Sequence, residues 1–208
     1  EAKRKSELKA LQSQINPHFL YNTLDSIIWM AEGRKYEEVV LMTASLARLL
    51  RQSISNEDEV VPLAREVEYA KGYLTIQKMR YKDKLEFEID VEPSILNIPL
   101  IKLVLQPIIE NAIYHGLKYK ESKGLLQVKG FMKDGNAVLQ VIDNGVGMDE
   151  ETLSHIYDKH KVNYHSNGVG VYNVQKRLKL YYGENYGITY ESEKGVGTTA
   201  TITIPGIQ

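Results

Sequence analysis

The sequence contains no cysteine among its 208 residues, which excludes a disulfide framework and a thiolate metal site. This absence fits a reducing compartment, so we predict a cytoplasmic location. An excess of one charge is also missing, because 26 Lys and Arg face 27 Asp and Glu. The balance predicts no nucleic-acid partner, which would require a basic surface.

Long hydrophobic segments are absent as well. No apolar run approaches the roughly 20 residues of a membrane-spanning helix, and no signal peptide is recognisable. Hydrophobic residues make up 43% and charged residues 25%, as in soluble globular proteins. The chain begins at Glu1, within a helical pattern and without an initiator methionine. We therefore expect it to be the soluble part of a longer protein.

The first third of the sequence predicts a helical hairpin. Residues 3–31 and 36–54 contain few strand signals, and only a short break at residues 33–35 separates them. Apolar residues of the first helix lie on two nearly opposite sides, which one hairpin cannot cover. We therefore predict a homodimer in which two hairpins form a four-helix bundle. The apolar residues of the first helix are Leu8, Leu11, Ile15 and Phe19 on one side, and Leu20, Leu24, Ile27, Ile28 and Ala31 on the other. From the second helix, the same core is expected to receive Val39, Val40, Met42, Leu46, Leu49 and Leu50.

The stretch QINPHFLYN, residues 14–22, places a histidine directly after a proline in the first predicted helix. Proline in a helix interior removes a backbone donor and costs roughly 3 kcal/mol. Pro17 falls where the apolar face changes side, so a local bend there has a use. His18 projects to the flank between the two apolar sides, which argues against a core histidine. None of the five histidines shows the spacing of a metal-ligand pair with a suitable partner.

The remaining sequence predicts a mixed α/β domain. The polar, acidic segment 55–60 marks the predicted boundary between a hairpin domain, 1–58, and a second domain, 59–208. Its predicted helices are 63–81, 99–118 and 169–182, and its predicted strands are 85–91, 125–132, 137–143, 187–192 and 199–205. A long polar loop precedes the last helix, and loops of this kind are often lids.

Two motifs of the second domain carry polar groups suited to a nucleotide, although each also has an ordinary structural interpretation. QPIIENAIYHG, residues 106–116, offers the amide of Asn111 either to solvent or to Mg²⁺, which prefers oxygen ligands. IDNGVGM, residues 142–148, is either a tight turn or a strand end whose Asp143 accepts from the amino group of adenine.

Two further motifs follow. SNGVGVYNVQKRL, residues 166–178, opens a helix with glycines, where unpaired N–H groups favour an anion. It matches neither a Rossmann fingerprint nor a Walker loop. GVGTTATITIP, residues 195–205, alone reads as the start of a strand. In this order, behind QINPHFLYN, the four motifs together favour a nucleotide site.

These motifs resemble those of the LytS/YesM-like sensor histidine kinases, and the resemblance spans nearly all of the chain. QINPHFLYNTLDSI is similar to the phosphoacceptor segment of that family. QPIIENAIYHG, DNGVGM and NGVGVYNVQKRL are similar to the N, G1 and G2 boxes of its GHKL-type ATP-binding domain. The resemblance implies an α+β fold, with an N-terminal helical hairpin forming a dimeric four-helix bundle, followed by a GHKL α/β sandwich that has a mixed sheet with helices on one face.

The resemblance also implies a function. ATP and Mg²⁺ are the expected cofactors, and a histidine is expected to be autophosphorylated before the phosphoryl group passes to an aspartate of a response-regulator receiver domain. The full-length protein is expected to be a cell-membrane sensor that is anchored upstream of this cytoplasmic portion.

Individual roles carry over to matching positions. His18 corresponds to the phosphoacceptor, Asn111 to the Mg²⁺ ligand and Asp143 to the adenine-binding aspartate. Glu110 and Asn22 are expected to assist the chemistry. The expected nucleotide-binding residues, besides Asn111 and Asp143, are His115, Gly145, Gly147, Gly168, Gly170, Asn173, Arg177 and Thr198.

Three positions depart from the pattern of histidine kinases. Phe19 stands where larger families place an acidic residue beside the acceptor. Pro107 replaces the first asparagine of the usual N box, as is normal for this subfamily. Tyr114 replaces a common lysine and leaves a phosphate contact unfilled. The candidates for that contact are His115, Lys159, Lys161 and His165.

Two alternative functions remain open. The chain could be a GHKL ATPase of the gyrase, MutL or chaperone kind. Those enzymes activate water with a glutamate one helical turn before the asparagine, where this chain has Pro107. It could also be a dimeric ATP-binding signalling scaffold without histidine phosphorylation, which the departures at Phe19 and Tyr114 would suit.

Overall fold

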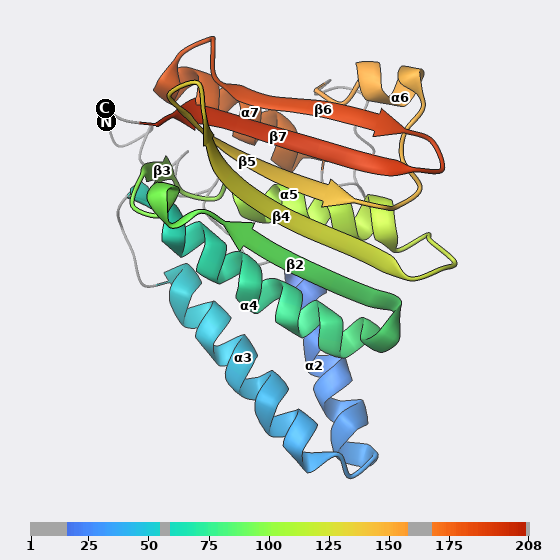
Figure 1. Ribbon diagram of the computed structural model, residues 1–208. Helices are drawn as coiled ribbons and strands as arrows, with labels where there is room; N and C mark the ends of the chain where they lie inside the picture. Colours follow the sequence, from blue (N-terminus) through green and yellow to red (C-terminus); the bar gives the residue numbers. More distant parts are fainter. Residues whose placement is uncertain (1–15, 55–58, 158–167, 207–208) are drawn as a thin grey trace.

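The computed structural model describes residues 16–54, 59–157 and 168–206, which form a helical hairpin and a five-stranded sheet with helices on one face (Figure 1). Within these residues, no helix is both long and apolar enough to cross a bilayer. The boundary predicted at residues 58 and 59 falls beside the undescribed segment 55–58 and stays a prediction.

The hairpin consists of α2 (Pro17–Glu32) and α3 (Tyr36–Ile54). Asn16 lies outside the helix and caps it, because its side chain accepts a hydrogen bond from the backbone N–H of His18 at 3.0 Å. The prediction of a helix that continues through Pro17 is therefore wrong at this point. Proline occupies the first helical position, where its missing N–H costs nothing.

One apolar side of the hairpin packs against α4 (Leu63–Tyr81) of the same chain (Figure 1). Phe19 is 1% exposed, and its ring lies 4.8 Å from that of Tyr73, measured between centroids. A second copy is therefore not needed to cover this side. Three of the core residues predicted on the second helix are fully buried: Met42, Leu46 and Leu49.

The other side of the hairpin is open in the single chain. Val40 is 68% exposed in the single chain, so its assignment to the core of a dimeric bundle stays a prediction. Large hydrophobic side chains remain exposed on both helices: Tyr21, Leu24, Ile28, Trp29, Tyr36, Val40 and Leu41. The predicted residues Leu8, Leu11 and Ile15 lie outside the described residues.

The sheet is mixed, as predicted. In spatial order its strands are β2 (Leu85–Val91), β4 (Gly124–Lys133), β5 (Asn136–Asp143), β7 (Gly197–Pro205) and β6 (Gly187–Glu193). The pair β2–β4 is parallel, and the three following pairs are antiparallel. Each predicted strand is present and ends within two residues of its expected bounds. Together with α4, one face is covered by α5 (Leu105–Asn111) and α7 (Gly168–Tyr182) (Figure 1).

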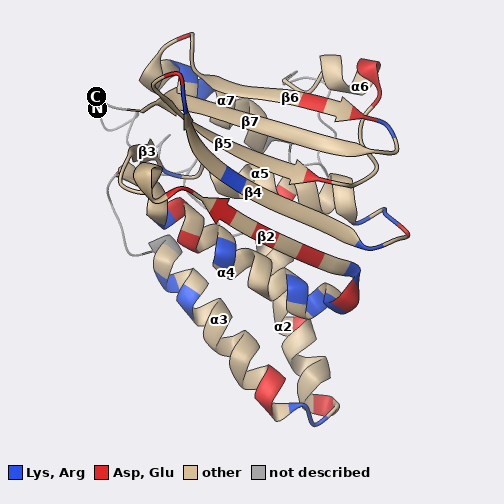
Figure 2. Cartoon of the chain, viewed as in Figure 1, with Lys and Arg blue, Asp and Glu red and all other residues tan. Residues whose placement is uncertain are grey.

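Charges of both signs are interspersed over the described elements (Figure 2). Acidic residues lie along β2, which forms one edge of the sheet. Two of them, Glu88 and Asp90, are exposed. Charged side chains on an edge strand discourage pairing with a strand of another molecule.

The segment before α5 differs from the prediction. Pro99 does not begin a helix, because residues Pro99–Ile101 form the short strand β3 and pair antiparallel with β1 (Val60–Pro62). The helix begins at Leu105 and continues as a π-helix, η3 (Ala112–Leu117). The polar loop that follows β5 also contains an unpredicted helix, α6 (Glu150–Ser154), which Asp149 caps. The 3-10 helices η1 (Lys82–Lys84) and η2 (Pro93–Ile95) flank β2.

A buried carboxylate fixes the start of α5. The side chain of Glu66, on α4, accepts hydrogen bonds at 3.0 Å from each of the three backbone N–H groups of residues 103–105. Arg177, on α7, donates to the carbonyl of Lys102 at 2.7 Å. Burial raises the pKa of Glu66, whereas the three N–H groups and Arg177 act in the opposite direction. Helices α4 and α7 thus hold the N-terminus of α5 from two sides.

We expect Glu66→Ala to lower the free energy of unfolding by roughly 2–4 kcal/mol, because buried N–H groups would lose their acceptor. Denaturant titration followed by circular dichroism measures this change. Glu68→Ala is the matched control, since Glu68 is exposed on the same helix. Its effect should stay within about 0.5 kcal/mol. Equal unfolding midpoints for the two variants would contradict the anchoring role of Glu66.

Candidate functional site

A cavity of about 540 Å³ lies between the sheet and the helices on its covered face. This volume is in the range of small-molecule sites, which is about 300–1,000 Å³. Five residues singled out from the sequence line it together: Asn111, His115, Asp143, Gly147 and Thr198. The segment that joins α5 to η3 supplies the first two, and the ends of β5 and β7 supply Asp143 and Thr198.

Asp143 ends strand β5 with a carboxylate that is 6% exposed. One oxygen accepts from the N–H of Gly145 at 2.8 Å. Burial raises the pKa of Asp143 to about 6, although the backbone N–H groups of Gly145 and Thr198 favour the charged form. Near neutral pH this carboxylate is mostly ionised and accepts hydrogen bonds only.

Glycines let the loop after Asp143 pack directly on η3. A Cβ on Gly116 would lie 2.7 Å from the Oδ1 of Asp143, and a Cβ on Gly145 would overlap the carbonyl of Gly116. Gly147 adopts φ +65°, a conformation that side chains rarely allow, and a Cβ there would meet the carbonyl of Glu193. The loop after Asp143 thus packs backbone against backbone at Gly116 and Glu193, which only glycine allows at positions 145 and 147.

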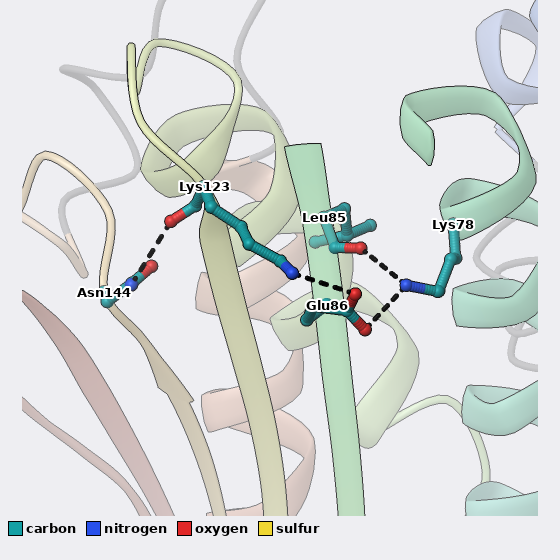
Figure 3. A network of polar contacts seen from close by, with 5 residues as sticks. All are labelled: Lys78, Leu85, Glu86, Lys123 and Asn144. Carbon is teal, nitrogen blue, oxygen red and sulfur yellow. Dashed lines mark hydrogen bonds and ion pairs between the residues drawn. The ribbon is translucent and has the colours of Figure 1, made fainter. Parts of the chain in front are cut away.

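A polar network holds the same loop from the other end (Figure 3). The Asn144 side chain accepts from the N–H of Leu125 at 2.7 Å and donates to the carbonyl of Lys123 at 3.5 Å. Glu86, on β2, pairs with Lys78 at 2.6 Å and with Lys123 at 3.1 Å. Hydrogen bonds from Lys78 and Lys123 hold the pKa of Glu86 below its usual range. The network ties the loop after Asp143 to β2 and α4.

Two polar atoms that line the cavity are buried without a hydrogen-bond partner among the described residues. They are the Oδ1 of Asn111 and the hydroxyl of Tyr190. Buried polar atoms are nearly always paired in folded proteins, so both are available to a ligand. Burial also raises the pKa of Tyr190, which keeps its hydroxyl protonated. Sequence analysis missed Tyr190, although its register with the buried Ala200 on β7 marks an inward position.

Thr198 is oriented by Ser192, which sequence analysis also missed. The Ser192 hydroxyl donates to the carbonyl of Gly197 at 3.0 Å, and its oxygen lies 2.7 Å from that of Thr198. Because the Ser192 hydroxyl already donates to the carbonyl of Gly197, the Thr198 hydroxyl donates to the Ser192 oxygen. The Thr198 oxygen keeps its lone pairs for a ligand. The Ser192 oxygen also accepts from the N–H of Met148, which lines the cavity.

Helix α7 contributes less to the cavity than expected. Gly168 begins this helix, and Val171 lines the cavity, whereas Gly170, Asn173 and Arg177 are not among the lining residues. Arg177 instead donates to backbone carbonyls before α5. The lid candidates Lys159, Lys161 and His165 lie outside the described residues.

Glu110 is also turned away from the cavity. It is 8% exposed, accepts from the Gln106 side chain at 2.8 Å, and does not line the cavity. Burial raises its pKa, and the hydrogen bond from Gln106 acts in the opposite direction.

His18 lies beside η3, the helix whose residues reach the cavity. The side chain is exposed, and its Nδ1 is 2.8 Å from the hydroxyl of Tyr114. The Nδ2 of Asn22 lies 3.1 Å from the same Nδ1. Tyr114 is therefore not an empty position in a phosphate site, but the residue that contacts the predicted phosphoacceptor.

Two family models match this chain, one over the helical hairpin and α4 and one over most of the remaining residues. Residues 6–85 match a family model described as histidine kinase, and residues 97–208 match one described as histidine kinase-, DNA gyrase B-, and HSP90-like ATPase. The second match alone covers more than half of the chain. The chain belongs to the histidine kinase family. The ATPase-type domain of this histidine kinase implies nucleotide binding, as the motifs predicted.

Relatives of this histidine kinase include sensor proteins. It is 37% identical over 202 residues to the sensor histidine kinase YesM of Bacillus subtilis strain 168, a match that covers 97% of this chain and 34% of YesM. It is 33% identical over 187 residues to the sensor protein LytS of Oceanobacillus iheyensis, covering 88% of this chain and 32% of LytS. The predicted LytS/YesM-like family is confirmed. The chain spans about a third of the length of these relatives.

Solved structures share the fold of this histidine kinase. The catalytic domain of the histidine kinase ThkA has a TM-score of 0.55 at 14% identity, covering 73% of this chain and 100% of that one. A histidine kinase domain of the blue-light-activated histidine kinase from Erythrobacter litoralis has a TM-score of 0.52 at 15% identity, covering 88% and 93%. The predicted α+β arrangement is thereby confirmed.

Burial of the Asp143 carboxylate in the kinase cavity lowers the free energy of unfolding when the group is charged. We expect Asp143→Asn to raise the free energy of unfolding by roughly 1–3 kcal/mol at about pH 7.5 without nucleotide. At that pH the wild-type carboxyl is ionised in both states, and its pKa of about 6 means that folding disfavours the charge. As pH falls from about 6 to 4, the folded carboxyl takes up a proton first, so wild type gains stability and the difference disappears.

Denaturant titrations across this pH range measure the effect of Asp143→Asn. Asp90→Asn is the control, because Asp90 is exposed on β2 and should show little change. An Asp143→Asn protein less stable than wild type at about pH 7.5 would contradict the assignment of a buried charge.

Proposed function

We propose that this chain is the catalytic portion of a sensor histidine kinase, which transfers the γ-phosphoryl group of ATP to His18 and then to an aspartate of a response-regulator receiver domain. One observation carries the proposal. A single helical segment, 111–117, lines the cavity with Asn111 and His115 and contacts His18 through Tyr114. One segment thus contacts both the proposed nucleotide site and the proposed acceptor, which lies on α2.

The adenine end of the site is supported by Asp143, Thr198 and Tyr190, which meet in the cavity. An ionised carboxylate suits the exocyclic amino group of adenine, because it only accepts hydrogen bonds. The hydroxyls of Thr198 and Tyr190 add two further hydrogen-bonding groups to the same cavity. Apolar residues complete the surroundings of a flat base: Ile108, Val141, Met148, Ile156, Val171 and Ala200.

The phosphate end is supported by Asn111, whose buried Oδ1 has no partner among the described residues. Such an oxygen fits Mg²⁺, which takes few protein ligands and completes its shell with water and substrate phosphates. When bound, the ion would neutralise charge on the phosphates. Within the described residues, no group of three or more His, Asp or Glu side chains forms a metal cluster. His115, beside Asn111, has its pKa lowered first by burial and then by Lys118, so it is a neutral hydrogen-bond partner at pH 7.

His18 suits the acceptor role because its ring is exposed and reachable by a second protein. A neutral imidazole carries the lone pair that attack on phosphorus requires. Phosphoryl transfer depends on positioning and charge neutralisation more than on covalent help. Asn22, one turn from His18, is placed to orient a group at the same ring.

A specific observation weakens the ATPase alternative. Glu110 is the acidic residue nearest to Asn111 in the sequence, but it is hydrogen-bonded to Gln106 and does not line the cavity. Pro107, one turn before Asn111, cannot activate water. Neither of these two positions therefore supplies the carboxylate that a GHKL ATPase uses near the asparagine to activate water.

Transfer to His18 can be tested with γ-labelled ATP and Mg²⁺. We expect wild type to acquire an acid-labile, base-stable label that is lost in His18→Gln. Nucleotide affinity of this variant should stay within about twofold of wild type, because His18 does not line the cavity. Asp143→Asn is the complementary variant and should lose both nucleotide binding and label. Label that persists in His18→Gln, or phosphate released without protein label, would overturn the proposal.

Dimerisation is part of the same proposal. The open side of the hairpin carries exposed side chains on both helices, including Leu24 (42%), Ile28 (53%) and Leu41 (56%). A second hairpin would remove them from water. Leu46, which was predicted in the bundle core, is 5% exposed within its own chain. A substitution there would disturb the single chain and would not test the dimer interface.

We expect the chain to sediment as a dimer that Leu24→Asp and Ile28→Asp together weaken by at least tenfold, since each places a charge in an apolar contact. Leu180→Asp is the control, because Leu180 is 77% exposed on α7, away from the hairpin. Sedimentation equilibrium measures the constants. A wild-type chain that stays monomeric at high micromolar concentration would contradict the dimer.

We also propose that the full-length protein is a membrane sensor with this portion on the cytoplasmic side. Support comes from the relatives, which are named sensor proteins and are about three times as long as the matched region. Membrane fractionation of the full-length protein tests this placement.

A further inference from the structure

Two departures from the pattern of histidine kinases, Phe19 beside the acceptor and Tyr114, meet at the contact between His18 and Tyr114. We propose that Tyr114 is a positioning residue for phosphoryl transfer: its hydroxyl oxygen accepts a hydrogen bond from Nδ1–H of His18 and leaves Nε2 as the attacking nitrogen. This inference rests on the proposed function, because it takes His18 as the acceptor.

The geometry singles out Nδ1 as the tethered nitrogen. Its 2.8 Å separation from the Tyr114 oxygen is that of a good hydrogen bond. The two rings are 5.8 Å apart between centroids and inclined by 51°, so they are not stacked and the contact is made by the polar atoms. The Nδ2 of Asn22 lies 3.1 Å from Nδ1 and 3.4 Å from Nε2. With Nδ1 protonated, this amide donates instead to the hydroxyl oxygen of Tyr114, with which it also forms a side-chain hydrogen bond. The nitrogen turned away from Tyr114 is therefore the one open to a phosphoryl group.

Reactivity decides the direction of this hydrogen bond. A neutral imidazole carries one proton, and the partner of one nitrogen determines which nitrogen holds it. If the Tyr114 hydroxyl donated to Nδ1, the proton would sit on Nε2 and block attack there. With Tyr114 as acceptor, Nδ1 keeps the proton and Nε2 keeps its lone pair. Burial raises the pKa of Tyr114, so its oxygen remains part of a neutral hydroxyl.

The Nε2 lone pair of His18 forms the N–P bond to the γ-phosphorus, and the bond between that phosphorus and the bridging oxygen breaks, so that ADP leaves with the electron pair. The ring is then an imidazolium with its proton on Nδ1. Because His18 is exposed, that proton can pass to water.

Phe19 explains why the partner of His18 comes from a distant part of the chain. Larger histidine kinase families place an acidic residue at the position of Phe19, but here this side chain is 1% exposed and packs on Tyr73. An acid at that position would be buried next to an aromatic ring. Tyr114, 96 residues further along the chain, supplies an acceptor instead. Nδ1 of His18 therefore holds the proton only while α2 lies against η3. Tyr114, which makes this contact, is close in sequence to the cavity residues Asn111 and His115.

Tyr114→Phe tests this inference, because it removes one oxygen and keeps the ring. Long-range ¹H–¹⁵N correlation spectra of the chain labelled with ¹⁵N-histidine report the tautomer of each histidine, and His18→Gln identifies the signals of His18. We expect wild-type His18 to be protonated mainly on Nδ1, and Tyr114→Phe to shift it toward the Nε2–H form. Autophosphorylation should fall about tenfold, the effect of one hydrogen bond.

Nucleotide affinity and the unfolding midpoint should not change in Tyr114→Phe, because Tyr114 does not line the cavity. Tyr119→Phe is the matched control, since Tyr119 is 66% exposed and follows the same helix. It should alter neither the tautomer nor the rate.

Three results would overturn the inference. They are a wild-type His18 that is protonated mainly on Nε2, a tautomer that Tyr114→Phe leaves unchanged, and a rate loss equal in Tyr119→Phe. Failure of the proposed function looks different, because wild type would then acquire no label on His18 whatever its tautomer.

Discussion

The burial of one carboxylate, that of Glu66, is the constraint on which the remaining architecture depends. Three N–H groups at the start of α5 converge on it, where the helix dipole also favours negative charge. Arg177 holds the carbonyls just before this point. The direction of α5 is thereby set before any ligand is present. Every later residue of that helix, including those of the cavity and the one that contacts His18, is placed by this start.

The helical segment whose start Glu66 holds, α5 and its continuation η3, contacts different parts of the molecule on two sides. At one side, Asn111 and His115 open onto the cavity. At the other, Tyr114 reaches the ring of His18. The α-helix changes to a π-helix after Asn111, between the residues that line the cavity and the residue that contacts His18. Single π-helical turns are frequent at functional sites. One helical segment thus contacts both the cavity and the ring of His18.

Much of this arrangement was accessible from the sequence, and the failures have physical causes. Strands were predicted well because one face is buried and alternation is strong, as in β4. The helix expected from Pro99 failed because β3 is fixed by pairing with the distant β1, which local patterns do not reveal. The role of Arg177 was misjudged because its partners lie 74 and 75 residues away. Asn111, Asp143 and Thr198 were found because their motifs are local. Tyr190 and the Tyr114 contact needed the assembled fold.

The cap formed by Asn16 has a further consequence for a phosphorylated chain. Because α2 begins at Pro17, His18 stands in the first turn of a sixteen-residue helix. A phosphoryl group on its ring would bring negative charge to the positive end of the helix dipole. The N-terminus of its own helix would thus stabilise the charge of the phosphorylated histidine.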